Sequence, residues 1–538
     1  MKLIWISNNI LFMLLSFRYV LADRDRDEGL EGFSTVRKGI LEKTFTVQFN
    51  GTEELAKQCL ESQGFKFEKK IAGNIYRVTK EGISPVKSID DMAQQLMNSP
   101  GKLCTSVLNL WRETIEDRAT RSAIPERSKR QTLDDAQWNE QWYLNDAHSP
   151  SMGVATAWTK GYSGAGIKIM VVDDGLETTH TDLSNNYLSH LGYDVFTDTT
   201  NPTPDPSTDS HGTSCAGIIA AEDNTECVIG IAYGSKIGGV RLIASTGATT
   251  SQEAEALVYK KDEIDIYSNS WGAPDDGQTI APISTIQEQA LIDGTTNGRN
   301  GLGAIYSWAA GNGGYEDDDC NYDGYANSPY TIAVTSLQTS SAPADYSEPC
   351  SALMCATYGG DYNDDFIATT DVSNGCTTTF VGTSAACPVA SGIFALVLES
   401  KPSLTWRDIQ HIIVETANND LHSSHDFYLN GAQKKVSTTA GFGLLDADAM
   451  ITKAASWTTV PERLSCESQQ VLIFYDWKIK LYGTSTDPLA TKEDDNVNVG
   501  AIVGGVVGGV AVVGGVVAVV GYVVMGNKAT ASVAPTTS

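Results

Sequence analysis

Three short segments of this 538-residue chain place a reactive side chain at the end of an expected strand or helix. Asp173 follows the apolar run 169–172 and precedes a glycine turn, where open α/β sheets present functional groups. His211 comes just before the small residues that open an apolar helix. Ser384 lies at the turn into a second apolar helix, where backbone N–H groups face an anion. Taken singly, each also has a structural explanation as a cap or a buried polar group.

Together, Asp, His and Ser in this chain order are typical of an acylating triad. Ser384 is expected to attack a carbonyl carbon, His211 to carry the proton, and Asp173 to orient and stabilise the imidazolium. The segment 307–314 adds a side-chain amide on a glycine turn, which makes Asn312 the candidate oxyanion donor. Such a donor contributes about 2.7–4 kcal/mol to lowering a barrier.

The elements that must position these side chains alternate along the chain after Arg130. The apolar, β-branched run 167–172 predicts a buried strand, and 213–221 and 253–260 have helical spacing, with Gly and Asn turns between them. This alternation predicts an α/β fold with a mostly parallel sheet and flanking helices.

A small α+β unit is expected before this sheet. Strand-like alternation covers 44–49 and 74–79, and helical spacing covers 53–60 and 88–97. The unit ends at the basic cluster 127–130, which follows a proline and is expected in an exposed, cleavable linker. A solvated charge run is the alternative interpretation of that cluster.

Charge and hydropathy restrict the partners and the compartment. The net charge is −28, and 49 of the 66 acidic residues follow Arg130, which disfavours nucleic-acid binding and favours basic partners or metal ions. Residues 1–22 resemble a cleaved signal peptide. The run 499–525 has no ionisable acid or base and is long enough to cross a membrane. We therefore expect a single-pass type I membrane protein of the secretory pathway, with its catalytic domain lumenal or extracellular.

The three segments 172–175, 211–217 and 382–388 resemble the signatures of the subtilisin-like serine proteases. The Cys after the His motif and the segments 267–272, 320–325 and 441–447 are similar to those of the kexin and furin proprotein convertases. The resemblance runs from about Asp135 to Trp457, and more loosely over the propeptide. It implies a calcium-dependent serine endoprotease that cleaves proproteins after basic residues.

The resemblance also implies acidic substrate pockets, since carboxylates bind guanidinium groups strongly. Asp275 and Asp323 would bind the residue before the cut, Asp174 the preceding residue, and Glu253 a basic residue further upstream. An acid expected after Gly277 is missing, because the chain has 279–282 as Thr-Ile-Ala-Pro. We therefore expect a preference for Lys-Arg or Arg-Arg with less demand for a distant arginine.

Calcium sites and disulfides follow from the same resemblance. One Ca²⁺ is expected at Asp135, Asp182 and the loop near Asn224. A second Ca²⁺ is expected at Asp275, Asp318 and Glu348; uncoordinated surface acids are the alternative for both. The implied disulfides are Cys227–Cys376 and Cys320–Cys350, with Cys215 as a free thiol near the histidine; Cys355, Cys387 and Cys466 have no implied partner.

The basic cluster 127–130 satisfies the expected specificity of the enzyme itself, so self-cleavage after Arg130 would release an inhibitory propeptide. After the catalytic domain, only a short remnant of the family's P domain is recognisable, too short to bury a core. An inactive or non-maturing isoform that at most binds basic peptides is therefore the alternative function. The expected parts are a signal peptide (1–22), propeptide (23–130), catalytic domain (131–456), P-domain remnant (457–484), linker (485–498), transmembrane helix (499–525) and cytoplasmic tail (526–538).

Overall fold

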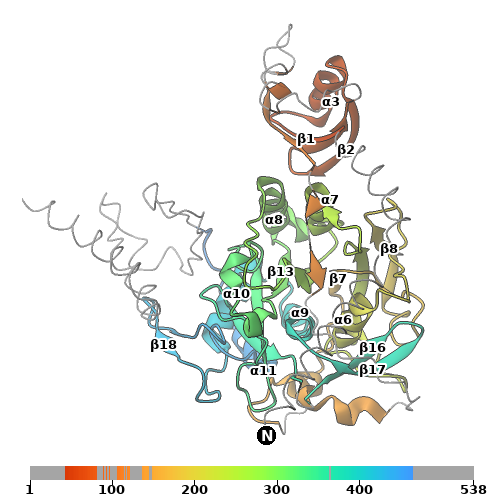
Figure 1. Ribbon diagram of the computed structural model, residues 1–538. Coiled ribbons are helices and arrows are strands. Elements are labelled where there is room, and N and C mark those ends of the chain that lie inside the picture. Colours follow the sequence, from red (N-terminus) through yellow and green to blue (C-terminus); the bar gives the residue numbers. More distant parts are fainter. Residues whose placement is uncertain are drawn as a thin grey trace, which may run out of the picture. The chain divides into compact units, whose positions relative to one another are not determined.

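The computed structural model describes residues 43–80, 89, 92–93, 96, 104, 106–113, 115–116, 118–120, 136–144, 148–362 and 365–463 (Figure 1). The chain clusters into two compact units, each of which combines segments that are distant in sequence. The expected signal peptide, basic cluster 127–130, linker and transmembrane segment lie outside the described residues.

The first unit contains an antiparallel four-stranded sheet in the order β2-β3-β1-β4, with one helix packed on it. Thr52 caps that helix through its side chain, and two acids fill the first helical turn, as the helix dipole favours. The expected strands and the expected helix over 53–60 are present, and within the expected helix over 88–97 the described residues 89, 92–93 and 96 are helical. The sheet has two further strands, β2 and β4, that the sequence did not indicate. The elements are β1 (Thr44–Phe49), α3 (Glu53–Ser62), β2 (Lys66–Ala72), β3 (Ile75–Thr79) and β4 (Val107–Arg112).

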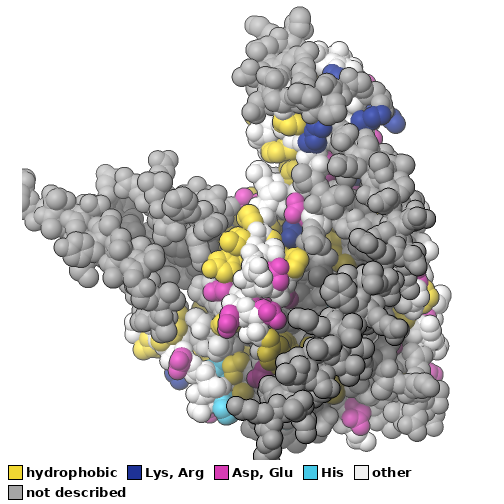
Figure 2. Space-filling model, in the orientation of Figure 1, with side chains coloured by type: hydrophobic (Ala, Val, Ile, Leu, Met, Phe, Trp, Pro, Cys, Tyr) yellow, Lys and Arg dark blue, Asp and Glu magenta, His cyan; other side chains and the backbone are white. Residues whose placement is uncertain are grey.

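Two helices from further along the chain belong to this first unit: α7 (Thr250–Val258) and the first turns of α8 (Thr285–Asn297). Lys69 pairs with Glu255 on α7 at 2.7 Å, and the Gly73 amide donates to the Asp293 carboxylate on α8 at 3.1 Å. Strand β5 (Ile115–Glu116) pairs antiparallel with β10 (Ala248–Thr249). The four-stranded sheet of this unit therefore packs on helices that come from much later in the chain. Figure 2 shows Lys and Arg side chains gathered on part of this unit.

The second unit is organised around a seven-stranded sheet in the order β15-β14-β13-β11-β7-β9-β8, parallel throughout. The predicted strand is β7, and its residues are buried because helices cover both faces of such sheets. The fold class expected from the alternation of strands and helices is confirmed. The strands are β7 (Lys168–Asp173), β8 (Tyr187–Asp194), β9 (Lys236–Arg241), β11 (Ile266–Asn269), β13 (Ile305–Ala309), β14 (Ile332–Leu337) and β15 (Cys355–Tyr358).

One long helix, α9 (Thr383–Ser400), contacts four strands of this sheet and also contacts α6 (His211–Ala220) (Figure 1). Helix α9 is apolar and long enough to cross a membrane, but 89% of its residues are buried inside the protein, so it is a core helix. Both helices are almost entirely buried, which explains why small and apolar residues dominate them. The remaining helices of this unit are α5 (Val154–Thr159), α10 (Trp406–Thr416) and α11 (Ala447–Ala455).

Short elements and the cross-links complete the structure. The short helices are η1 (Ala136–Glu140), η2 (Trp142–Leu144), η3 (Arg299–Gly301), η4 (Gly313–Glu316) and η5 (Cys320–Tyr322). The short strands are β6 (Ala119–Thr120), β12 (Trp271–Gly272), β16 (Ile367–Asp371), β17 (Gly375–Phe380), β18 (Tyr428–Leu429) and β19 (Lys435–Val436). The disulfides are the expected Cys227–Cys376 and Cys320–Cys350, and Cys59–Cys104, which the sequence left open.

The start of the expected P-domain remnant is hydrogen-bonded to Asp408 of α10. The Trp457 indole and the Val460 amide both donate to the same oxygen of Asp408, each at 2.9 Å. Asp408 also completes the capping box of α10 with Thr405, so one buried carboxylate holds the helix start and the segment. Residues beyond Arg463, including Cys466, lie outside the described part of the chain.

Candidate active site

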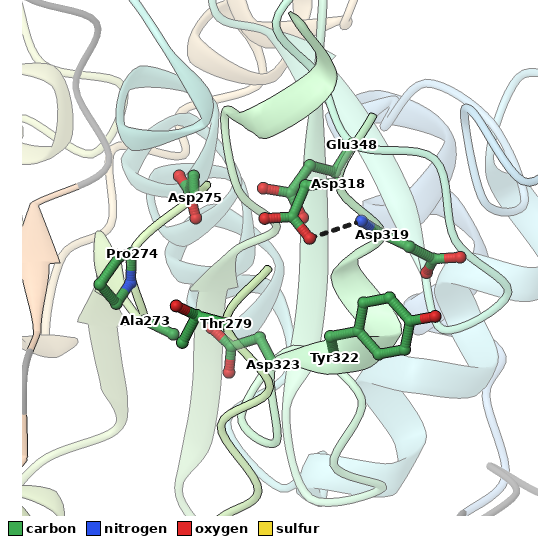
Figure 3. A pocket seen from close by; sticks show the side chains of 9 residues that line it. All are labelled: Ala273, Pro274, Asp275, Thr279, Asp318, Asp319, Tyr322, Asp323 and Glu348. Atoms are coloured by element: carbon green, nitrogen blue, oxygen red, sulfur yellow. Dashed lines mark hydrogen bonds between the residues drawn. The ribbon is translucent and has the colours of Figure 1, made fainter. Parts of the chain in front are cut away.

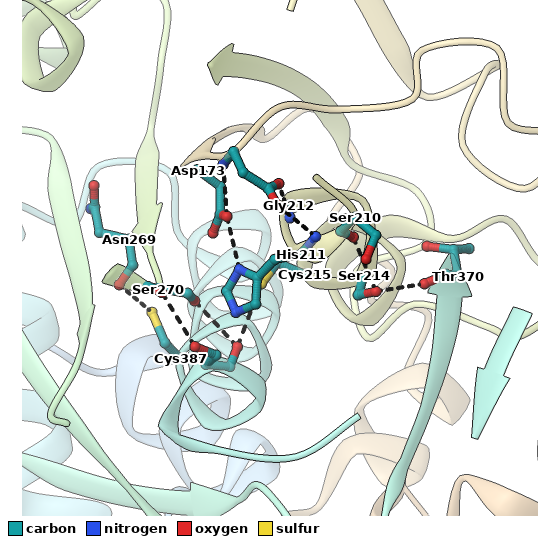
Figure 4. Close-up of polar contacts among 12 residues, drawn as sticks. Asp173, Ser210, His211, Gly212, Ser214, Cys215, Asn269, Ser270, Thr370 and Cys387 are labelled. Carbon is teal, nitrogen blue, oxygen red and sulfur yellow. Dashed lines mark hydrogen bonds and ion pairs between the residues drawn. The ribbon is translucent and has the colours of Figure 1, made fainter. Parts of the chain in front are cut away.

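The C-terminal end of β7 and the start of α6 bring Asp173 and His211 together. His211 Nδ1 lies 2.8 Å from Asp173 Oδ1, and both side chains are buried (Figure 4). Burial alone would lower the pKa of His211, but the charges of Asp173 and Cys215 and the hydrogen bonds to both side chains together raise it well above its usual value. Among the described residues, His211 Nε2 has no hydrogen-bond partner. The pair is thus arranged to accept a proton at Nε2.

Ser384 is the second residue of α9, after Gly382, whose φ of +127° suits glycine. The Ser384 hydroxyl donates to the carbonyl of Ser270 at 3.2 Å. The Cys215 thiol lies close to both residues, with Sγ 3.6 Å from the backbone carbonyl oxygen of Ser384 and 3.8 Å from His211 Nδ1. Helix packing of α6 on α9 therefore places the three predicted triad residues in one site.

Asn312 follows β13 and faces the start of α9. Its Oδ1 accepts from the Thr383 amide and the Thr383 hydroxyl, both at 2.9 Å. Two donors on Oδ1 fix the amide plane and leave Nδ2 as the donor for an oxyanion. The preceding Gly311 cannot carry a side chain, because a Cβ there would lie 2.2 Å from an oxygen of Glu348.

Both carboxylate oxygens of Asp174 are hydrogen-bonded to the backbone of the protein itself. Its two carboxylate oxygens accept from the amides of His211 (2.9 Å) and Gly212 (2.7 Å). Burial and the neighbouring charge of Asp173 raise the pKa of Asp174. The side chain therefore orients the start of α6, and only 7% of Asp174 is exposed to a substrate.

Five carboxylates line one pocket beside the active site (Figure 3). Figure 3 shows Asp318 and Glu348 side by side, with Asp275 facing them and Asp323 lower in the pocket. Backbone amides donate to all five acids. The donors are Asn312 to Asp275 (2.8 Å), Gly313 to Glu348 (2.9 Å), Gly277 to Asp318 (3.0 Å), Asn321 to Asp319 (2.9 Å) and Tyr325 to Asp323 (2.8 Å). The sequence had indicated four of the five acids. It missed Asp319, whose pKa is raised by burial, and Tyr322, which also lines the pocket.

Asp182, a predicted calcium ligand, is partly hydrogen-bonded within the protein. Its Oδ2 accepts from the Val228 amide at 3.1 Å, whereas Oδ1 is buried without a partner among the described residues. Burial raises the pKa of Asp182 to about 6, and hydrogen bonding to the Asn224 side chain opposes this. The predicted Asp182 and Asn224 are thus neighbours, while Asp135 lies outside the described residues, as does Arg130.

Glu253 belongs to the first unit, on α7. It is fully buried and accepts from the Gln287 side-chain amide at 2.6 Å. In this state the carboxylate is enclosed by the protein, so a substrate side chain would have to displace Gln287 to reach it.

A parallel sheet with a buried Asp–His pair and a serine at the start of the central helix defines the class of subtilisin-like serine proteases. The chain belongs to the subtilase family, whose model matches residues 164–443. It is 37% identical to human furin over 439 residues, which cover 79% of this chain and 53% of furin. It is 41% identical to rat proprotein convertase subtilisin/kexin type 5 over 367 residues, which cover 66% of this chain and 20% of that protein.

These comparisons concern part of each relative. The chain spans about half the length of the furins it matches. Among solved structures, fervidolysin from Fervidobacterium pennivorans has a TM-score of 0.55 at 18% identity, covering 76% of this chain and 61% of that one. At that identity, the likeness concerns the fold alone.

Proposed function

We propose that this protein is a serine endoprotease of the proprotein-convertase type. The observation that carries the proposal is the buried Asp173–His211 pair, with Cys215 close to both His211 and Ser384 at the start of α9. In the reaction, Ser384 leaves the Ser270 carbonyl, passes its proton to His211 Nε2 and attacks the substrate carbonyl. The Asn312 amide stabilises the oxyanion, the scissile C–N bond breaks as His211 gives its proton to the leaving amine, and water then hydrolyses the acyl-enzyme to restore Ser384.

The substrate class is a polypeptide with basic residues before the cut, Lys-Arg or Arg-Arg by preference. The support is the carboxylate-lined pocket, which includes Asp275 and Asp323 and whose first residue, Ala273, directly follows the strand Trp271–Gly272. Several carboxylates close together attract a cation and repel an acid. A guanidinium inserted among them would gain charge-assisted hydrogen bonds.

This specificity is tested with Asp323→Asn, which removes one charge from the pocket and keeps the side-chain shape. We expect kcat/KM for a peptide cleaved after Arg to fall about 30-fold or more, with little change for an uncharged peptide. Asp319→Asn is the matched control, because in Figure 3 that carboxylate points away from the others. Equal hydrolysis of Lys-Arg and uncharged peptides by the wild type would refute the substrate class.

Asn312→Ala tests the oxyanion donor. Removing one preorganised donor is expected to lower kcat by about 10²–10³-fold, with KM little changed, because the interaction forms in the transition state. Thr383 would lose its acceptor as well, so Asn312→Asp serves as the second variant: it keeps the acceptor oxygen and removes the Nδ2 donor. An unchanged kcat in both variants would exclude this role.

Calcium fits two sets of oxygen ligands in this chain. The unpartnered, buried Asp182 Oδ1 is the kind of charge that a protein retains when a cation neutralises it, and Asn224 is adjacent. Asp275, Asp318 and Glu348 could hold a second ion beside the substrate pocket. Bound there, calcium would supply positive charge and rigidity to the loops.

The calcium proposal predicts a stability effect at Asp182. Chelation by EGTA should lower the melting temperature of the wild type by about 5 °C or more, because the buried charge is then uncompensated. Asp182→Asn should reduce this response, since the uncharged amide needs no cation. Asp223→Asn, an exposed change on the following loop, should respond like the wild type. Equal responses of wild type and Asp182→Asn would contradict calcium binding there.

The proposal also covers how the enzyme is activated and where in the cell it is located. The propeptide would inhibit the enzyme until self-cleavage in the basic linker that ends at Arg130, and the segment 499–525 would anchor the catalytic domain on the lumenal or outer side of a secretory membrane. These parts rest on the sequence patterns and on the furin relatives.

A further inference from the structure

The loop between β1 and α3 contains the tripeptide Asn50-Gly51-Thr52. It is the one Asn-X-Ser/Thr triplet of the sequence with a middle residue other than proline, because the second such triplet has Pro202 after Asn201. This triplet is the acceptor sequence for N-linked glycosylation in the secretory pathway. Since so short a pattern also arises by chance, the site must in addition be accessible in the folded protein.

Asn50 lies at the surface of the first unit, directly after the last residue of β1. All three residues of the triplet are exposed. The Asn50 backbone amide donates to the Ser106 carbonyl at 2.7 Å, whereas its side chain makes no hydrogen bond to any described residue. A sugar on the side-chain nitrogen therefore breaks no contact of the described structure and extends into solvent.

Thr52 has a structural role that explains its presence without any sugar. Its hydroxyl caps α3 by accepting from the Leu55 amide at 3.4 Å. A cap needs only an oxygen acceptor, so serine at this position would preserve both the cap and the acceptor triplet, and alanine would remove both. Asn50→Gln, in contrast, removes the triplet and leaves the cap. The two positions thus separate the modification from the stability of the helix.

The same unit contains a disulfide, which indicates an oxidising compartment. Cys59 of α3 is bonded to Cys104, and both residues are buried. Such disulfides are typical of secreted and lumenal proteins and are rare in the cytosol. The transferase that attaches N-linked sugars acts on chains that enter this compartment, so the segment with Asn50 passes the enzyme.

We propose that Asn50 is an N-glycosylation site. The donor is an oligosaccharide linked to a lipid through pyrophosphate. Asn50 Nδ2 bonds to the anomeric carbon of the first sugar, the bond from that carbon to the pyrophosphate oxygen breaks, and the amide loses one proton. The lipid pyrophosphate leaves with the electron pair, so the step needs no oxidant or reductant. The sugar is attached before the unit folds, and the exposed loop accommodates it afterwards.

The inference rests on the secretory location in the proposed function, but not on the protease activity. It places the N-linked sugar of this chain on the first unit, because the second unit has no Asn-X-Ser/Thr triplet without proline. Asp173, His211 and Ser384 all belong to the second unit. The sugar and the catalytic residues are therefore carried by different units.

The same triplet rule applies to two variants of the calcium test. Asp182→Asn and Asp223→Asn each create an acceptor triplet, with Ser184 and Thr225 as the hydroxyl residues. In secretory cells both variants would gain a sugar that changes the stability by itself. Each is therefore combined with a substitution of its exposed hydroxyl residue, Ser184→Ala or Thr225→Ala, which removes the triplet.

The test of the inference is expression of the full chain in secretory cells, as wild type and as Ser384→Ala, followed by treatment with peptide N-glycosidase F. We expect one discrete gain in electrophoretic mobility of the chain with Asn50, and conversion of Asn50 to aspartate in the mass spectrum of its peptide. Thr52→Ser should keep the shift, whereas Asn50→Gln and Thr52→Ala should abolish it. Because the sugar is added before folding, a variant that folds poorly still reports its occupancy. A shift that persists in Asn50→Gln would overturn the assignment.

Ala432→Thr distinguishes an unused site from a chain that does not enter the lumen. It creates an acceptor triplet at Asn430, whose Oδ1 accepts from the Ala432 and Lys434 amides and leaves Nδ2 for a sugar. This variant should show a second shift in addition to that of the wild type. A shift in Ala432→Thr but not in the wild type would overturn the inference and leave the secretory location intact, and no shift in either would overturn both. Equal shifts in wild type and Ser384→Ala, without peptide hydrolysis by the wild type, would support the inference and refute the protease function.

Discussion

Ser384→Ala should abolish both peptide hydrolysis and self-processing, with kcat lower by about 10⁶-fold. The loss is this large because the nucleophile, the base and the carboxylate act as one unit. The fold should be preserved, since the hydroxyl makes one hydrogen bond, at 3.2 Å to the Ser270 carbonyl. A peptide-hydrolysis assay measures the loss of activity, and the melting temperature of the variant measures whether the fold is preserved.

The matched control for this variant is Ser391→Ala, on the same helix. Ser391 is also buried and donates to Ser268 Oγ at 2.9 Å, so its loss removes a comparable contact from the core. It should lower stability modestly and leave kcat within about tenfold of the wild type. Substantial turnover by Ser384→Ala would require a different nucleophile. An uncleaved proform in both wild type and Ser384→Ala would instead favour the inactive isoform.

Asp173→Asn should lower kcat by about 10⁴-fold, because an amide holds His211 in the wrong tautomer and does not stabilise the imidazolium. It should also change the pH profile. His211 must be unprotonated to act as the base, so activity rises with pH through its pKa, which Asp173 helps to raise well above the usual value. Removal of that charge should move the rising limb of kcat/KM to lower pH.

Asp194→Asn provides the control for the pH profile. Asp194 ends β8, two strands away from β7 in the same sheet, and lies 3.5 Å from Arg241 of the intervening strand. Its pH profile should coincide with that of the wild type. A rising limb that stays in place in Asp173→Asn would show that the limb reports a group other than His211.

Much of the catalytic fold could be predicted from the sequence. The strand before Asp173 and the helices after His211 and Ser384 are encoded by short runs of β-branched, small or apolar residues. Such patterns act over a few residues, and their periods distinguish strand from helix. Strand β2 was missed because its sequence, Lys-Phe-Glu-Lys-Lys-Ile-Ala, is mostly charged at an edge of the sheet.

A local pattern also identified Asn312, and the resemblance to the convertases indicated four of the five pocket acids. They did not show that both Asp174 oxygens are occupied by backbone amides, or that Glu253 is enclosed with Gln287. Whether a carboxylate faces solvent, a ligand or a backbone donor depends on which segments pack around it. No short stretch of sequence contains that information.

The sequence by itself determined the reactive residue types, their chain order and the alternation of strands and helices, because these depend on composition and short-range spacing. Only the tertiary structure decided that His211 meets Asp173 at 2.8 Å, that Cys59 pairs with Cys104, and that Thr120 lies opposite Trp271. Each of these contacts joins residues separated by 38 to 151 positions. Closing such loops lowers the conformational entropy of the chain, and only the packing of the whole core offsets that cost. Local sequence therefore cannot specify the partner.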